Sequence, residues 1–121
     1  GMTWSWASGF KFLAFEGTFT SPTVSNATSY MIHTGKFGTD YNYTTVNLDL
    51  PTNALVRTNI TPQIHLSTDL SQIIDGTNKV NLSENNGMGM GAMIMGGPLL
   101  PLITANLSDM FEVEHVHNDA N

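Results

Sequence analysis

The chain of 121 residues contains no cysteine, which excludes a disulfide framework, a thiolate zinc site and thiol catalysis. It also has few basic residues, since four Lys and Arg stand against ten Asp and Glu, for a formal charge of −6. Nucleic acids and anionic membranes bind clustered cations, so neither is an expected partner. No apolar run approaches the roughly 20 residues that span a bilayer, and no signal-peptide pattern precedes the first motif.

Charged residues make up only 12% of the sequence, whereas hydrophobic residues make up 40%. A chain of this length fits one domain, and such a domain can bury a core without disulfides or a structural metal. Asn, Thr, Ser and Gly are abundant, and a neutral surface of this kind is typical of exported β proteins. We therefore expect a single domain over residues 1–121.

Several short segments have the apolar composition or the period-2 alternation of strands. The expected strands are residues 9–19, 28–33, 45–50, 63–67, 80–82 and 111–117. The first is dominated by Phe and other apolar types, which predicts a strand buried on both faces. Residues 45–50 alternate most regularly, because Val46, Leu48 and Leu50 share one side of the segment.

Helical spacing is weaker and is confined to two places. Residues 99–110 carry apolar side chains at helical intervals and predict a short helix, while residues 69–74 allow one or two helical turns. The glycine-rich residues 86–98 predict an irregular loop. Together these patterns indicate an all-β, antiparallel β-sandwich-like domain with one short helix near the C-terminus.

Four histidines offer the most interpretable chemistry. On a strand, His115 and His117 project from one face, roughly 7 Å apart, which suits a shared metal; a solvated C-terminal tail is the alternative. His33 lies one strand step from Met31, and imidazole with thioether suits Cu(I), although a partly buried structural histidine is also possible. His65 shares the polar side of its strand with neighbouring polar residues, which favours solvent exposure.

Two tryptophans, Trp4 and Trp6, share parity and would lie on one face of a strand, so packing in a core or an interface is their first explanation. The methionines from Met88 to Met95 alternate with glycine as in soft-metal sites, but flexible packing accounts for them equally well. No usual nucleophile motif is present, and a lone carboxylate such as Glu16 is not a mechanism. The sequence therefore does not predict an enzyme.

Three motifs resemble those of the MbnP-like family of methanobactin-associated periplasmic proteins. The opening Met2-Thr-Trp4-Ser-Trp6-Ala-Ser-Gly-Phe10-Lys-Phe, followed by Glu16-Gly17, resembles the family signature M-x-W-x-W-x-S-G-Y-K-F…E-G, with Phe10 in place of the usual Tyr. His33-Thr-Gly35 is similar to an H-x-G element. Near the C-terminus, Asn106…Met110-Phe111…His115-Val-His117 resembles the closing N…F…H pattern of the family.

The resemblance implies a periplasmic or cell-surface copper-binding protein. In some members histidines and a tryptophan oxidised to kynurenine are the ligands, and a dihaem enzyme is the oxidising partner. On this basis we expect His33, His115 and His117 to bind copper, with Trp4 or Trp6 as a conditional contributor. This expectation requires His33 to approach the other two through sheet pairing. The alternative is a structural or ligand-binding β-sandwich, with a protein or saccharide partner and no metal.

The signature begins here at the second residue, whereas several strands precede it in the proteins that the chain resembles. We therefore expect a partial domain, and Gly1 is typical of a residue left by tag removal. A sheet edge without its neighbour predicts a homo-oligomer, most simply a dimer, with the strand of Trp4 and Trp6 in the interface.

Overall fold

The computed structural model describes residues 2–5, 9–37 and 39–120 of the chain. In chain order its elements are β1 (Thr3–Ser5), β2 (Gly9–Ser21), β3 (Val24–Phe37), β4 (Asp40–Tyr41), β5 (Ile60–Thr68), α1 (Gln72–Asp75), the 3₁₀ turn η1 (Gly87–Gly89), β6 (Ala92–Ile94), α2 (Leu99–Asn106), the 3₁₀ turn η2 (Leu107–Asp109) and β7 (Phe111–Ala120). The strands form two sheets: β1-β2-β3-β4 with β6 beside β3, and the pair β5-β7.

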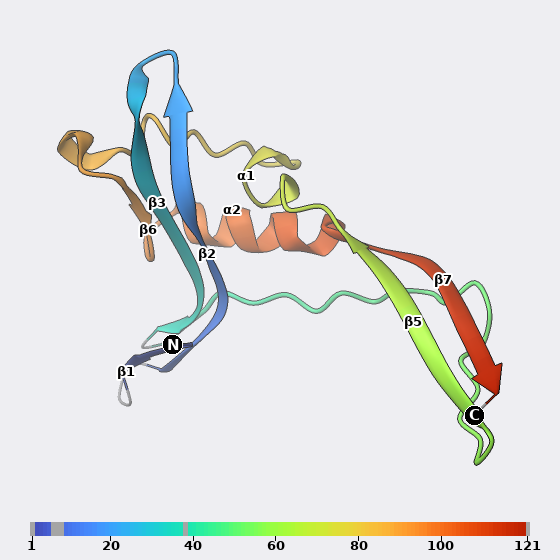
Figure 1. Cartoon of the computed structure of the whole chain (residues 1–121). Helices are drawn as coiled ribbons and strands as arrows, with labels where there is room; N and C mark the ends of the chain where they lie inside the picture. The colour runs from blue at the N-terminus through green and yellow to red at the C-terminus, as the bar shows by residue number, and fades with distance from the viewer. Residues whose placement is uncertain (1, 6–8, 38, 121) are drawn as a thin grey trace.

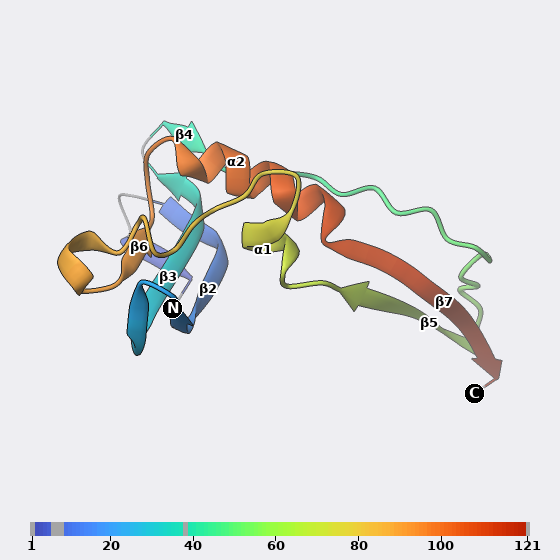
Figure 2. The same ribbon diagram turned by 90° about the horizontal axis from the view of Figure 1, so that it is seen from above.

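The predicted fold class is confirmed. The chain is mostly β, its main strand pairs are antiparallel, and the one helix of two turns, α2, lies near the C-terminus. Figures 1 and 2 show that α2 lies between the two sheets and that β5 and β7 extend away from the larger sheet. Within the described residues, no helix is long and apolar enough to cross a membrane.

The long hairpin of β2 and β3 is the centre of the larger sheet. Its strands pair from Lys11 opposite Gly35 to Ser21 opposite Val24, so a two-residue turn joins them. The prediction that residues 9–19 are buried on both faces is wrong, because burial alternates along β2 and Phe10 and Phe12 are exposed. On β2 the covered face carries Leu13, Phe15 and Phe19, which pack against the core.

The hydrophobic core lies on that covered face, beneath β3, β6 and the two helices. Its buried members are Ile32, Ile73, Val80, Leu82, Ala92, Ile94, Leu100, Ile103 and Met110. Every one of these side chains comes from outside β5 and β7. The core therefore belongs to the larger sheet and the helices, which we call the body.

Two of the predicted strands are not strands in the described structure. Residues 45–50 are extended and alternate in exposure, but they form no strand, because none of the described strands pairs with them. Residues 80–82 are likewise outside any strand, although Val80 and Leu82 are buried in the core. Their apolar character reflects burial rather than strand pairing.

The glycine-rich loop expected over residues 86–98 contains a strand. β6 runs parallel to β3, with Met93 opposite Met31 and Ile94 opposite Ile32. Gly91 permits this approach, since a Cβ there would lie 2.9 Å from the Ser29 carbonyl oxygen and its φ is +125°. The parallel partner is far away in sequence, which is why local pattern did not reveal it.

The β5-β7 pair, which we call the ribbon, is joined to β4 by a long extended linker (green in Figure 1). Asn118 holds this linker against β7: its side chain accepts a hydrogen bond from the Leu55 amide (2.7 Å) and donates one to the Asn53 carbonyl (3.0 Å). The antiparallel register, from Ile60 opposite Ala120 to Thr68 opposite Phe111, fixes which side chains meet across the ribbon.

Candidate metal centre

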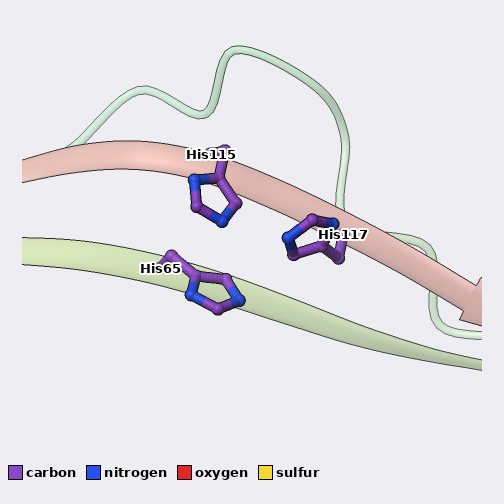
Figure 3. Close-up of side chains that lie close together, drawn as sticks. All are labelled: His65, His115 and His117. Atoms are coloured by element: carbon purple, nitrogen blue, oxygen red, sulfur yellow. The ribbon is translucent and has the colours of Figure 1, made fainter.

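Three histidines meet on one side of the ribbon. His115 and His117 stand two residues apart on β7, and His65 of β5 lies directly opposite His115. Successive residues of a strand point to opposite faces, so this register brings the three imidazoles together. Figure 3 shows His65 from one strand and His115 and His117 from the other, gathered around a common point.

The rings of this His65–His115–His117 triad are in direct contact. The ring centroids of His65 and His115 lie 4.2 Å apart in a stacked arrangement. The His117 ring meets His65 at 4.9 Å and His115 at 4.5 Å, edge to face in both cases. One nitrogen from each ring lies within 4.8 Å of the other two. Imidazole nitrogens that bind one metal each lie about 2.0–2.1 Å from the ion, so the three nitrogens would have to move slightly closer to one another. Rotation of the exposed side chains supplies that approach.

A β-bulge in β7 lies next to the triad. The strands pair one-to-one up to His65 opposite His115, but the next pair is Leu66 opposite Val113, so Glu114 is an extra residue. Such a bulge bends the strand and changes the direction of the neighbouring side chains. It lies at the triad, where orientation of the imidazoles decides whether they converge.

The His65 imidazole carries a polar atom that the described residues do not satisfy. Its Nε2 is shielded from solvent and makes no hydrogen bond. His115 and His117 are exposed, while His65 is half-buried between the strands. A shielded nitrogen without a partner costs free energy unless something binds it. A shielded nitrogen without a partner among the described residues thus belongs to the triad.

His33 is not a member of the triad, and the prediction that it approaches His115 and His117 by sheet pairing is wrong. It lies on β3, opposite Ala14, in the other sheet. Its ring is buried, and its Nε2 lies 2.5 Å from Glu16 Oε1. The alternative for this residue, a buried structural histidine, describes that geometry well, because a carboxylate partner satisfies the ring nitrogen.

The remaining candidates from the sequence are the two tryptophans and the glycine-alternating methionines. Trp4 lies in β1, but its side chain, and the whole of Trp6, are outside the described part of the chain. Met88 and Met90 are 96% and 84% exposed. Packing in an apolar loop therefore does not explain these two methionines.

His65 is the site residue that sequence reasoning missed. Its polar strand neighbours favoured solvent exposure, and they do share its side of β5. The missing fact was the partner strand: only the register places His65 opposite His115 rather than opposite an apolar residue. The cross-strand neighbour of such a histidine is set by the register and cannot be read from its own strand.

Comparison with known proteins gives one finding. Neither the curated proteins nor the solved structures contain a match to this chain. The family model described as MbnP matches residues 1–94, which include His33, His65 and both tryptophans and stop before β7. Because this match covers more than half of the sequence, and the fold has the expected antiparallel sheets, the chain belongs to the MbnP family.

Proposed function

We propose that this protein binds copper, without catalysing a reaction, at the His65–His115–His117 triad. The observation that carries the proposal is the convergence of three imidazole nitrogens within 4.8 Å, one of them shielded and unpartnered among the described residues. Family membership supports copper as the metal and the periplasm or cell surface as the location. The triad replaces the set of His33, His115 and His117 that the sequence suggested.

The donor set suits copper on chemical grounds. Neutral imidazole is a ligand for Cu, Zn, Ni and Fe, and the affinity of a nitrogen site for divalent ions rises to a maximum at Cu²⁺. Three imidazoles leave at least one position for solvent or a further ligand. Because His115 and His117 are exposed, an ion reaches the triad without any opening of the body. These features support reversible binding of a metal that arrives from solution.

The experiment is a titration of the folded protein with Cu(II), and with Cu(I) under reducing conditions, against a chromophoric chelator. We expect one ion per chain. His65→Ala should weaken binding more than the roughly 10–100-fold loss typical of outer-shell partners, since it removes a direct ligand. His115→Ala and His117→Ala should have similar effects. Zn(II) in competition should be displaced by Cu(II).

The matched control is His33→Gln, which changes a histidine outside the triad. It should retain full copper affinity; if it fails to fold by circular dichroism, Glu16→Gln tests the same pair more mildly. Loss of binding in the control together with full binding in His65→Ala would assign the metal to His33 instead. A well-folded wild-type protein that binds neither copper ion would end the proposal.

We also infer from the family that Trp4 or Trp6, after oxidation by a partner such as a dihaem enzyme, supplies a further ligand. The sequence supports this through the paired tryptophans of the opening motif. Intact mass of protein isolated from its native host tests the inference. An unmodified mass in protein that is fully loaded with copper would contradict it, whereas the triad titration does not depend on it.

Self-association is the third part of the proposal. The interface that the sequence suggested, around Trp4 and Trp6, involves side chains outside the described residues, so the proposal here uses the ribbon. In the described chain the ribbon has only two strands, and Ile64 and Leu66 on β5 are each 48% exposed. Pairing with a second copy along the β5 edge would cover apolar side chains and backbone groups that otherwise face water. Light scattering at micromolar concentration should give a homo-oligomer, and Ile64→Lys should shift it towards monomer. A wild-type monomer would contradict this part.

A further inference from the structure

A cavity of about 360 Å³ lies beside the body, and its lining residues include none of the triad histidines. Its walls come from β2, β3, the start of the linker, the segment that joins α2 to β7, and the first residue of β7. The side chains that matter for its chemistry are Phe12, Leu13, Thr34, Tyr43, Met110 and Phe111. The volume falls at the lower end of the range for small-molecule sites, which is about 300–1,000 Å³.

A bulge in β2 contributes to this wall. Lys11 pairs with Gly35 and Leu13 with Thr34, so Phe12 is an extra residue in β2. Gly35 allows the strands to remain close at this point, since its φ is +153° and a Cβ would lie 2.2 Å from the Phe10 carbonyl oxygen. The Asn42 amide donates a hydrogen bond to the Gly35 carbonyl (2.9 Å), which holds the linker beside β3.

Two aromatic rings border the cavity. Phe12 and Tyr43 meet edge to face, with centroids 6.1 Å apart, although they come from β2 and from the linker. Both rings remain more than half exposed, at 52% and 59%. Aromatic side chains left open to water beside an apolar hollow indicate that a further apolar surface is needed to cover them.

One lining residue of the cavity carries a buried polar group without a partner among the described residues. Thr34 is fully buried, and its Oγ1 has no hydrogen-bond partner among the described residues. A buried hydroxyl without a partner is destabilising, whereas a hydroxyl that can donate or accept to a ligand provides orientation and specificity. No lining residue of the cavity is charged. The arrangement is apolar walls, an aromatic rim and one unpaired hydroxyl.

We propose that this cavity binds a small, uncharged aromatic molecule that carries one hydroxyl or carbonyl group. The ring packs against Phe12, Tyr43 and the apolar walls, and the polar group bonds to Thr34. Charged ligands are disfavoured because nothing in the lining compensates a charge.

The test uses 4-fluorophenol as the probe, observed by fluorine NMR, with 4-fluorotoluene as the matched probe that lacks the hydroxyl. We expect saturable binding of 4-fluorophenol. Thr34→Val keeps the shape and removes the hydroxyl, so it should weaken 4-fluorophenol binding about fivefold and leave 4-fluorotoluene unchanged. Thr18→Val, an exposed threonine of β2 outside the cavity, is the control and should change neither affinity.

If Thr34→Val does not fold, Thr44→Phe tests the same cavity from the linker side and should abolish binding by filling it. Equal affinity of both probes, or no effect of either cavity variant on binding, would overturn the proposal. Absence of binding together with self-association that Tyr43→Ser abolishes would also overturn it, and would assign the rim to a second copy. Copper titration has no part in these outcomes, so the two sites are judged separately.

Discussion

The body and the ribbon divide stability and chemistry between them. The body contains all nine buried hydrophobic residues of the core, whereas every residue of β5 and β7 is half-buried or exposed. The triad lies entirely on the ribbon. A two-stranded ribbon with no core of its own is at best marginally stable in water, so a metal that joins its strands also changes how firmly they pair.

Because the core and the triad lie in different regions, changes at the triad need not destabilise the fold. Burial of apolar area stabilises the body, and that term does not involve the histidines of the ribbon. His33, in contrast, is packed inside the body beside Glu16 and acts within its structure. Substitutions in the two regions should therefore separate into effects on unfolding and effects on binding.

The largest expected effect is in the core. Ile103 is fully buried in α2, so Ile103→Ala removes apolar contacts and leaves a cavity, at a cost of about 2–5 kcal/mol. His115→Ala on the exposed side of the ribbon should change the free energy of unfolding by no more than ~0.5 kcal/mol without metal. Urea denaturation of the apo protein measures both. Equal losses would mean that the ribbon is part of the cooperative core.

Copper binding should stabilise the pairing of β5 with β7. An ion that binds only the folded state at about a hundred times its Kd stabilises that state by about 2.7 kcal/mol. We expect this gain in the wild type, absent in His65→Ala, together with slower hydrogen exchange of β5 and β7 amides. Acidification should remove the gain, because imidazole binds a metal in its neutral form. Protection confined to β2 and β3 would contradict the assignment to the triad.

Asn106 tests whether a substitution in the body changes stability without changing copper affinity. This motif residue is 1% exposed, and its side chain donates to the carbonyls of Ile73 and Asn78 (3.1 and 2.8 Å) and accepts from the Asn78 amide (2.9 Å). Asn106→Ala leaves buried backbone groups unpaired, which should cost about 1–3 kcal/mol. Copper affinity should be unaffected. Loss of affinity with unchanged stability would give Asn106 a role at the site.

The smallest effect lies where the ribbon meets the body. Asp69 follows β5, and the Ser71 side chain and amide donate to its Oδ1 at 2.6 and 3.0 Å. These hydrogen bonds, first that of the Ser71 side chain, lower the pKa of the Asp69 carboxyl below its usual 3.8. Because the folded-state pKa is the lower one, the contribution to stability is present above pH 3.8 and is lost as the pH falls through the folded pKa.

Acid denaturation of Asp69→Asn measures this contribution. The carboxyl is fully exposed, so we expect only a small fall in the thermal midpoint at neutral pH, and a smaller difference from wild type in strong acid. A difference that grows as the pH falls would contradict the direction of the pKa shift.

Local pattern was a good guide where a residue's own strand or helix decided its environment. The hairpin strands, β5, α2 and β7 follow from alternation or helical spacing within short windows. Residues 45–50 show the limit: their alternation is real in exposure, but a strand requires a partner, and none of the described strands supplies one. β6 is the converse, a strand with weak local signal that exists because β3 lies beside it.

The sequence by itself determined the class of the fold, the family to which residues 1–94 match, and the shared face of His115 and His117, because each of these can be recognised from patterns within the chain. Only the tertiary structure decided that His65 completes the triad and that His33 turns to Glu16 instead. The physical reason is the register between strands distant in sequence: a shift by one residue would move His65 to the opposite face of the ribbon, and no local preference of the chain fixes that register.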